Sequence, residues 1–449
     1  MSRWWHKGDN LEYYKLKDIA TIYNGNSINK TVKEQKYMQK VPGWNYISTK
    51  DVDFDGTVQY ENGVIIPYAE TKFRVAPAGS VFVCSEGGSA GRKTAIITED
   101  VCFGNKLFAI VNDRDRYVGK YLYYFTRYSG FTKQFKLLAT SLMGGISAKN
   151  FGAIEVPLPS LEEQDKIIRQ IEELFSELDK GVETLQTIKE QLIVYRQAVL
   201  KEAFEGKLTS SWRAENTLSN PQYDFDKIRR PNELFKDTSG DENEIALNLP
   251  PTWLKARLGE IFEVQVGATP SRRVPEYWNG NINWVSSGEV RFNTIFRTNE
   301  KITPEGLAHA STNLQPIGTV MLAMIGEGKT RGQAAILNTE AAHNQNTAAI
   351  LVSQTPCSPK YVYYFLQMNY DNTRRVGSGN NQKALNKERV RAIRFPFTSF
   401  DEQQKIVEEI ESRLSVCDSI EQTVDTALAQ AEAMRQSILK KAFEGELCK

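Results

Sequence analysis

Two long stretches of the chain carry apolar residues at a seven-residue spacing, the pattern of a helix that packs against another helix. In residues 161–206 the repeating positions are Ile171, Leu178, Leu185, Leu192 and Val199, with Leu174, Ile188 and Tyr195 on the alternate seam. In residues 400–445 they are Ile410, Cys417, Val424, Ala431 and Ile438, with Ile420, Ala427 and Met434 between them. The bulky first seam fits the smaller second one, so we predict that the two helices pair with each other. The pattern alone also fits a simple dimerisation device.

Each stretch has signals for where a helix starts and stops. Ser160 and Ser399 are N-cap residues, and Glu163 and Glu402 follow three residues later, as in a capping box. The stretches end at Gly206 and Gly445, which fit C-terminal stops. A helix of about 44 residues, at roughly 1.5 Å per residue, spans on the order of 65 Å.

The two stretches are copies of one another at a fixed offset. Matching pairs are Gln164 and Gln403, Arg196 and Arg435, and Phe204 and Phe443, and each pair differs by 239 in residue number (403−164). No gap is needed across either span. A chain of two such halves predicts pseudo-twofold organisation and a target with two parts.

Two further regions, residues 1–160 and 251–399, also correspond to each other, and we call them the first and second basic modules. Shared segments are Leu16–Gly25 with Leu258–Gly267, Trp44–Thr49 with Ile282–Ser287, and Tyr121–Phe125 with Tyr361–Phe365. Each module predicts short β-strands, a Tyr-rich helix and Gly-rich loops. The expected fold class is therefore α+β: two globular α/β domains alternating with two long antiparallel coiled-coil helices. Residues 207–250 predict a polar, partly flexible connector.

Charge separates the modules from the helices. The whole chain has a formal net charge of +1, but each helical stretch carries −5, while the modules carry +6 and +7. Attraction to phosphate belongs to the modules, and the acidic helices should face away from nucleic acid or meet a protein.

Cysteine and histidine usage limits the chemistry. Five scattered cysteines without a CxxC pair indicate reduced thiols in the cytoplasm. Three dispersed histidines are too few for a zinc centre or a His-dependent nuclease. We expect no secretory signal and no membrane span, because no apolar run approaches the roughly 20 residues that a span needs.

Equivalent Gly-rich loops in the two modules are the first candidate binding residues. The loop at Gly326–Thr330 resembles a P-loop, but the required first glycine is Ala323, and a strand rather than a helix should follow. Glycine lets a backbone approach a duplex, and arginine or lysine reaches phosphates or guanine edges. The candidates are Ser85, Gly88, Ser89, Arg92, Lys93, Lys329, Thr330, Arg331 and Gln333, with Ser287 after an earlier strand. A solvated hairpin is the alternative interpretation.

Polar residues in two more loops extend the candidate surface. These are Asn105, Lys106, Asn344, Gln345 and Asn346 after the next strand, then Lys149, Asn380, Gln382 and Lys383 near the end of each module. Asn and Gln can contact adenine bidentately, although turn residues that bond their own backbone give the same pattern. The tyrosine clusters at Tyr121–Phe125 and Tyr361–Phe365 could stack on bases, but we favour a packed helix face.

Three motifs together resemble the type I restriction–modification specificity subunits (HsdS). They are Pro157–Gln164 at the start of the first helix, Arg196–Leu208 at its end, and Leu249–Trp253 at the start of the second module. The resemblance covers essentially the whole chain. It implies that each module is a target-recognition domain that reads half of a split DNA site, and that the helices set the spacer.

The resemblance also implies partners and no chemistry of its own. Two methyltransferase subunits would dock on the helices and supply adenine-N6 methylation with S-adenosylmethionine. Restriction/translocase subunits, which use Mg and ATP, would add endonuclease activity. The expected helix–helix and subunit interface residues are Ile171, Leu178, Leu185, Leu192, Val199, Ile410, Val424 and Ile438. We expect no metal, no directly bound cofactor and no catalytic residues.

Two other functions stay open at this stage. A coiled-coil scaffold with two lectin-like or peptide-binding modules would lack the steep salt dependence of a DNA reader. A self-contained restriction–methylation enzyme would transfer methyl groups without partners.

Overall fold

The structure, a computed structural model, describes residues 12–39, 41–112, 115–139, 145–217, 219–230, 247–326, 328–375 and 385–447. The chain divides into two compact units. Unit 1 contains residues 1–187 and 424–449, and unit 2 contains residues 188–423. Each unit therefore holds one basic module, the first part of one long helix and the last part of the other.

The two long helices are α6 (Leu161–Phe204) and α14 (Phe400–Phe443), each of 44 residues. Gly206 and Gly445 follow them with positive φ of 67° and 76°, a conformation that glycine adopts at little cost. The predicted helix lengths and stop signals are confirmed.

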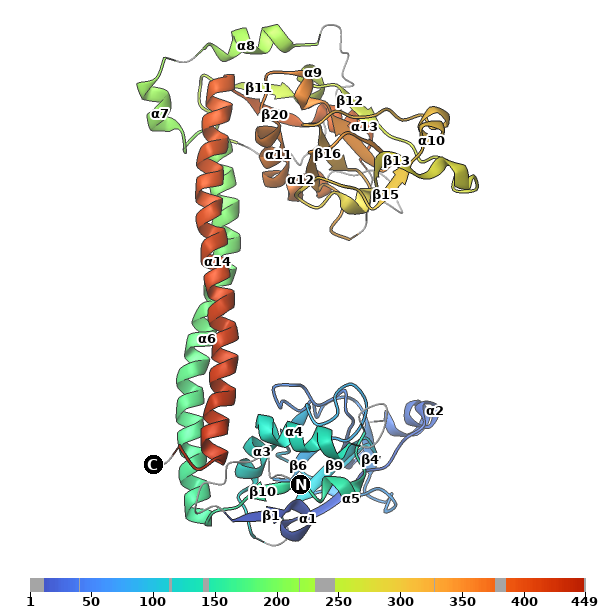
Figure 1. Cartoon of the computed structure of the whole chain (residues 1–449), viewed down its shortest axis with the longest axis vertical. Coiled ribbons are helices and arrows are strands. Elements are labelled where there is room, and N and C mark those ends of the chain that lie inside the picture. Colours follow the sequence, from blue (N-terminus) through green and yellow to red (C-terminus); the bar gives the residue numbers. More distant parts are fainter. Residues whose placement is uncertain are drawn as a thin grey trace. The chain divides into compact units, whose positions relative to one another are not determined.

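In unit 1 the basic module forms three small sheets, which Figure 1 shows beside short helices. The first sheet pairs β1 (Tyr13–Lys15) with β10 (Glu155–Pro157). The second has the order β2 (Thr21–Asn24), β9 (Leu107–Val111), β6 (Val81–Cys84), β7 (Thr94–Ile96). The third has the order β4 (Ile65–Pro67), β3 (Gly43–Ile47), β8 (Val101–Phe103), β5 (Val75–Ala76). The short helices are α1 (Leu16–Ile19), α2 (Lys30–Val32) running into a π-helical turn, α3 (Gly119–Arg127), α4 (Ser129–Leu138) and α5 (Ala148–Phe151).

In unit 2 the module repeats this plan. Its first sheet pairs β11 (Leu254–Arg257) with β20 (Arg394–Phe397). The second has the order β12 (Val264–Val266), β19 (Thr347–Ile350), β16 (Val320–Ala323), β17 (Ala334–Leu337), β14 (Asn293–Ile295). The third has the order β15 (Glu300–Ile302), β13 (Trp278–Val285), β18 (Ala341–His343). Its helices are α9 (Leu258–Ile261), α10 (Pro304–His309), α11 (Pro359–Met368), α12 (Tyr370–Arg375) and α13 (Lys387–Ala392). The strand orders correspond in the described residues, except that the second sheet of unit 2 has the additional strand β14 and its third sheet has three strands where unit 1 has four. This correspondence confirms the predicted fold class and internal repeat.

The Tyr-rich helices form core in both modules, as predicted. α3 lies against β6 and β7, and α11 lies against β16 and β17. Tyr121, Phe125, Tyr361 and Phe365 are each at most 2% exposed. The hydroxyls of Tyr121 and Tyr361 donate to backbone carbonyls at 2.8 and 3.1 Å, so burial leaves neither phenol unsatisfied.

The last residue of each long helix packs into the module of its unit. Phe443 lies 5.5 Å from Phe125 between ring centroids in unit 1, and Phe204 lies 5.5 Å from Phe365 in unit 2. The end of α14 thus completes the core of the first module, and the end of α6 completes the core of the second. The repeated phenylalanines of the sequence have a packing role.

The repeated glutamines fasten each long helix to the Tyr-rich helix of its unit. Gln164 and Gln403 are fully buried. Their side-chain oxygens accept the N–H of Val118 at 2.9 Å and of Ser358 at 3.4 Å, which are the N-cap residues of α3 and α11. Their side-chain nitrogens donate to the carbonyl five residues earlier, at 2.9 Å in both cases.

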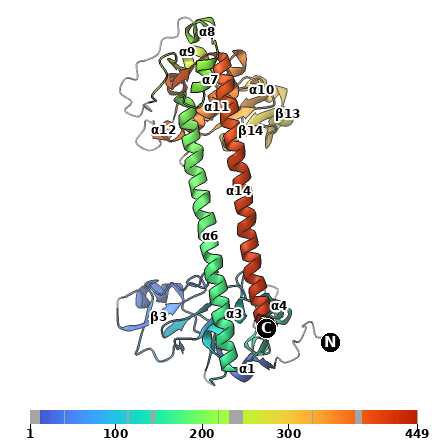
Figure 2. The same ribbon diagram turned by 90° about the vertical axis from the view of Figure 1, so that its left-hand side faces the viewer.

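Within each unit α6 and α14 run side by side and antiparallel (Figure 2). Arg196 bonds Asp418 at 2.7 Å in unit 2, and Arg435 bonds Asp179 in unit 1. Because Arg435 and Asp418 each follow their counterparts by 239 residues (435−196 and 418−179), the same register holds in both units.

The structure places the predicted seam residues unequally. Ile171, Leu192, Val199, Ile410 and Val424 are at most 9% exposed. Leu178, Leu185 and Ile438 are half-buried. The alternate seam differs from expectation, because Leu174, Tyr195, Ile420 and Met434 are 38–55% exposed.

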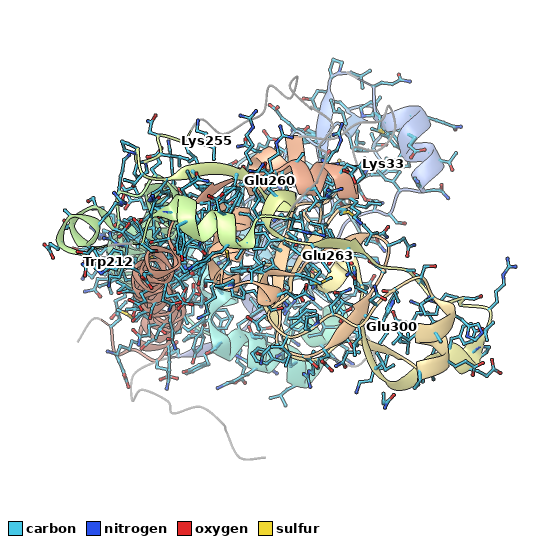
Figure 3. The ribbon with its side chains drawn as sticks, turned by 90° about the horizontal axis from the view of Figure 1, so that it is seen from above. Lys33, Trp212, Lys255, Glu260, Glu263 and Glu300 are labelled. Atoms are coloured by element: carbon cyan, nitrogen blue, oxygen red, sulfur yellow. The ribbon has the colours of Figure 1, made fainter. Side chains whose placement is uncertain are left out.

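The connector is more structured than predicted. It contains α7 (Ser210–Glu215) and α8 (Pro221–Ile228), although residues 231–246 lie outside the described part. Trp212 of α7 and Glu260 of α9 are labelled in Figure 3. The carbonyl of Glu260 accepts the N–H of Arg230, just after α8, at 2.9 Å. Local composition predicted loops for this connector, whereas contacts with the rest of unit 2 stabilise helices in it.

One predicted capping box is complete and the other is not. The hydroxyl of Ser160 and the carboxylate of Glu163 each accept the other's backbone N–H at 3.3 Å. Ser399 accepts the N–H of Glu402 at 3.3 Å, but the carboxylate of Glu402 is bonded elsewhere. It is 1% exposed and accepts from four side chains: Thr209 at 2.9 Å, Arg213 at 2.7 Å, Trp253 at 2.9 Å and Thr398 at 2.5 Å.

Candidate nucleic-acid interface

Three loops meet at one edge of the first module. They are the hairpin loop 85–93 between β6 and β7, the turn 104–106 between β8 and β9, and the segment 145–149 leading into α5. Ser85 joins them: its N–H donates to the carbonyl of Lys106 at 2.9 Å, and its carbonyl accepts the N–H of Ile146 at 3.1 Å. We call these residues the three-loop surface of unit 1.

The second module brings the corresponding loops together. They are residues 324–333 apart from 327, the turn 344–346, and the segment that resumes at Leu385. Met324 takes the part of Ser85, because its N–H donates to Asn346 at 2.8 Å and its carbonyl accepts from Leu385 at 3.0 Å. These residues form the three-loop surface of unit 2.

Most of the predicted binding residues lie on these two surfaces with accessible side chains or backbone. Exposed are Gly88, Arg92, Asn105, Lys106, Lys149, Lys329 and Gln345. Half-buried are Ser89, Lys93, Thr330, Arg331, Gln333 and Asn346. Ser287, also predicted and half-buried, lies in the 3-10 turn Ser287–Glu289 and belongs to none of the three loops. Asn380, Gln382 and Lys383, also predicted, lie outside the described residues.

Two predicted residues do not present their side chains. Ser85 is 5% exposed and acts through its backbone, as described above. Asn344 is 7% exposed, and its side-chain oxygen accepts the N–H of Asn346 at 3.1 Å. Asn344 therefore satisfies its own turn, the alternative that the sequence left open, and we leave both side chains out of the surface.

The hairpin cations of unit 1 are held in place by their neighbours. Arg92 donates to the carbonyl of Gly88 at 3.0 Å, and Lys93 donates to that of Thr49 at 3.2 Å. Both charges lie over the ring of Phe54, at 5.2 and 5.1 Å from its centroid. Such ordering reduces the side-chain entropy lost on binding a ligand.

Phe54 was not among the predicted residues. Its ring is 54% exposed, and its carbonyl accepts from Arg127 at 3.2 Å, which holds the loop backbone in place. In the sequence it lies between Asp53 and Asp55, so its surroundings gave no sign of a basic surface. Only the tertiary fold brings it against Arg92 and Lys93.

Other predicted residues have local partners. Lys106 forms an ion pair with Glu86 of the neighbouring loop at 3.0 Å, and both side chains are exposed. Beside the turn of unit 2, His343 is 1% exposed, and burial lowers the pKa of its imidazole to about 4. The imidazole is therefore neutral at pH 7, and lysine and arginine supply the charge of this surface.

The Gly326–Thr330 segment continues through a turn into strand β17. A P-loop has a helix N-terminus at this point, whereas here the next element is the strand β17. In the described parts of the chain, no group of three His, Cys, Asp or Glu side chains could hold a metal ion. No helix in those same parts is long and apolar enough to cross a membrane.

Each unit thus combines a mixed α/β module, a loop surface that carries lysine and arginine, and parts of two long helices. The sequence profile of the type I restriction modification DNA specificity domain matches residues 8–192 and again 250–430. The chain belongs to this family and is a specificity subunit of a type I restriction–modification system.

Relatives with known names are similar to this chain over much of its length. The chain is 24% identical over 447 residues to the type I restriction enzyme EcoBI specificity subunit of Escherichia coli, covering 96% of this chain and 85% of that one. It is 25% identical over 342 residues to the EcoKI specificity subunit of Escherichia coli K12, covering 73% and 65%.

The fold matches two solved structures. One, from a study of complex assembly and conformational transition of the type I R-M system, gives a TM-score of 0.70 at 15% identity, covering 99% and 100% of the chains. The HsdS subunit from Thermoanaerobacter tengcongensis gives 0.55 at 15% identity, covering 99% of both chains.

Proposed function

We propose that each basic module reads one half of a bipartite double-stranded DNA site through its three-loop surface, and that α6 and α14 set the spacer between the halves. The chain would contribute recognition without chemistry, binding no cofactor or metal itself. Two methyltransferase subunits would supply S-adenosylmethionine-dependent adenine methylation, and restriction/translocase subunits would use Mg and ATP. Its place of action would be the cytoplasm.

The observation that carries this proposal is the convergence of the same three loops in both modules. Sequence regions about 20 to 60 residues apart meet through equivalent backbone hydrogen bonds, at Ser85 and at Met324. The exposed cations Arg92 and Lys329 lie on these loops. Lysine and arginine on loops fixed by a rigid sheet suit phosphate contact and base readout.

Replacing Lys329 by Ala tests the surface of unit 2. The side chain is exposed, so its removal should leave the fold intact. We expect DNA binding by the complex with methyltransferase subunits to weaken by about 1–3 kcal/mol if Lys329 contacts a base, and by less for a lone phosphate. Fluorescence anisotropy against target duplexes over a range of salt concentrations measures the change.

Lys180→Ala is the matched control, since it removes the same exposed charge from α6. It should leave affinity and salt dependence unchanged. Equal losses in the two variants would indicate a general charge effect and remove Lys329 from the reading surface. A wild-type complex whose affinity does not fall steeply with salt would favour the scaffold hypothesis.

Exposed apolar residues on the paired helices support the docking part of the proposal. In unit 2, Ile193, Val194 and Val416 are 66%, 70% and 58% exposed, and Tyr195 and Ile420 are 46% and 40% exposed. In the antiparallel register that the Arg196–Asp418 pair sets, Val194 is level with Ile420, and Val416 lies about one helical turn, roughly 6 Å, further along the pair. Clustered exposed apolar side chains mark interaction sites in soluble proteins.

The double variant Val194→Asp, Val416→Asp should lose co-purification with the methyltransferase subunits. Burying a carboxylate in an apolar interface costs several kcal/mol when no partner compensates it. Pull-down and size-exclusion chromatography with light scattering give the stoichiometry. Leu137→Asp, which changes an apolar residue 74% exposed on α4, should assemble normally. An intact complex with the double variant would place docking elsewhere.

A further inference from the structure

Two arginines of unit 2 fix the hairpin loop to α12 through each other's backbone. Arg331 donates through Nη2 to the carbonyl of Arg374 at 2.7 Å, and Arg374 donates through Nη1 to the carbonyl of Arg331 at 3.4 Å. The hydroxyl of Tyr370 donates to the carbonyl of Lys329 at 2.5 Å and accepts from Arg374 at 3.0 Å. The guanidinium of Arg374 lies 5.4 Å from the centroid of the Tyr370 ring.

Within the part of the chain that the structure describes, which excludes Glu327 of the same loop, this arrangement places like charges together without a compensating anion. Among the described residues, no carboxylate forms an ion pair with Arg331 or Arg374, and Nε of Arg331 is buried without a hydrogen-bond partner. Burial lowers the pKa of the Arg331 guanidinium, and the nearby charge of Arg374 lowers it further. Two like charges held this close repel each other, and an anion that contacts both would relieve the repulsion.

The fold does not require the pair. In unit 1 the corresponding hairpin glycine, Gly91, lies against the ring of Phe135 on α4. In unit 2 the same approach brings Gly332 against Tyr370 and Arg374 on α12. An aromatic ring therefore closes this junction in both modules, and unit 2 adds the side chain of Arg374.

We propose that Arg331 and Arg374 form an oxyanion site that holds a backbone phosphate of the DNA bound by unit 2. A guanidinium presents parallel N–H donors that match phosphate oxygens, and two of them facing one anion convert mutual repulsion into attraction. Arg331 belongs to the three-loop surface of unit 2, and Arg374 extends that surface onto α12. The N–H of Gly332, next to Arg331, donates to the carbonyl of Ala323, next to Met324, at 2.8 Å. The assignment of the anion to DNA rests on the proposed function.

Arg374 acts here as a second contact residue that the sequence did not single out. Tyr370 and Arg374 are one helical turn apart on α12, so the ring and hydroxyl of Tyr370 hold the guanidinium in position. Because the charges are ordered before binding, little entropy is lost when the phosphate arrives. The site carries no base specificity and should fix the position of unit 2 on its half-site.

Arg374→Gln in the complex with methyltransferase subunits is the test. With a duplex that carries the target sequence, identified by its methylation, we expect the affinity of the complex for DNA to fall roughly tenfold. A lost charge-assisted hydrogen bond changes binding by that order. The slope of log K against log salt should fall by about 0.9, the value for one phosphate. Arg374→Lys, which keeps the charge, should retain most of the slope and guards against a folding defect.

Arg229→Gln, which removes a charge from the end of α8, is the matched control and should change neither quantity. Single methylphosphonate substitutions along the unit 2 half-site sharpen the result. At one substituted phosphate the wild-type complex should lose affinity for DNA. The Arg374→Gln complex should bind that substituted duplex and the unsubstituted duplex equally well. Equal affinity and slope for wild type and Arg374→Gln, or additive losses at every methylphosphonate, would overturn the site.

Inorganic phosphate separates the two sources of the anion. If the site were built for free phosphate, phosphate would raise the melting temperature relative to chloride at equal ionic strength, and Arg374→Gln would remove that effect without changing DNA binding. That outcome overturns the assignment to DNA. Failure of the proposed function has a different signature, because the wild-type complex itself would then not prefer target over unrelated duplexes.

Discussion

A matched insertion of seven residues into both long helices should abolish methylation of the original target and move activity to a target with a longer spacer. The insertions belong after Gln186 in α6 and after Ala427 in α14. These positions face each other in the register that Arg196–Asp418 and Arg435–Asp179 define. Seven residues make nearly two helical turns, so the buried seam continues in phase.

The expected shift follows from helix geometry. Seven residues at roughly 1.5 Å add about 10 Å, which corresponds to about three base pairs at roughly 3.4 Å each. An insertion in α6 alone would instead separate Arg196 from Asp418 and should impair assembly. The matched design therefore tests spacing and keeps the helix pairing intact.

Methylation of duplexes whose spacer is lengthened stepwise, assayed with labelled S-adenosylmethionine and the methyltransferase subunits, measures the optimum. The same seven residues inserted after Asn216, at the end of α7, form the control and should leave the optimum in place. An optimum unchanged by the matched helix insertion would exclude the role of the helices in setting the spacer.

Arg213→Ala should destabilise unit 2 by about 3–5 kcal/mol, the second-largest effect that we expect. The variant leaves the carboxylate of Glu402, 1% exposed, without its cationic partner at 2.7 Å. Uncompensated buried charges have costs of this size. Urea denaturation of the subunit gives the free energy, and hydrogen exchange of residues 209–216 should rise because Arg213 also bonds the carbonyl of Gly206.

Two comparisons isolate the cause. Arg213→Met combined with Glu402→Gln should be more stable than Arg213→Ala alone, because a neutral amide needs no counterion. Lys405→Ala removes ion pairs to Glu408 and Glu409 at 3.4 and 3.3 Å on the surface of the same helix, and should change stability by less than about 1 kcal/mol. A small effect of Arg213→Ala would show that the cluster does not hold α7.

Sequence reasoning predicted the loops of the candidate surface more accurately than the side chains that those loops expose. Glycines and cations at equivalent places predicted the hairpins that carry Arg92 and Lys329, because turn chemistry is local. It included Ser85 and Asn344, whose burial depends on strands distant in sequence. It missed Phe54 and Arg374, which reach the surface only through contacts with loops 40 or so residues away.

The sequence by itself determined the two helices, their starts and stops, the internal repeat, the tyrosine cores and the separation of charge. Each of these depends on periodicity or on residues close along the chain. Only the tertiary structure decided which seam is buried, what Glu402 binds, and how the connector folds. Those outcomes depend on packing and desolvation between distant segments, such as Glu402 with Arg213, and no local pattern encodes them.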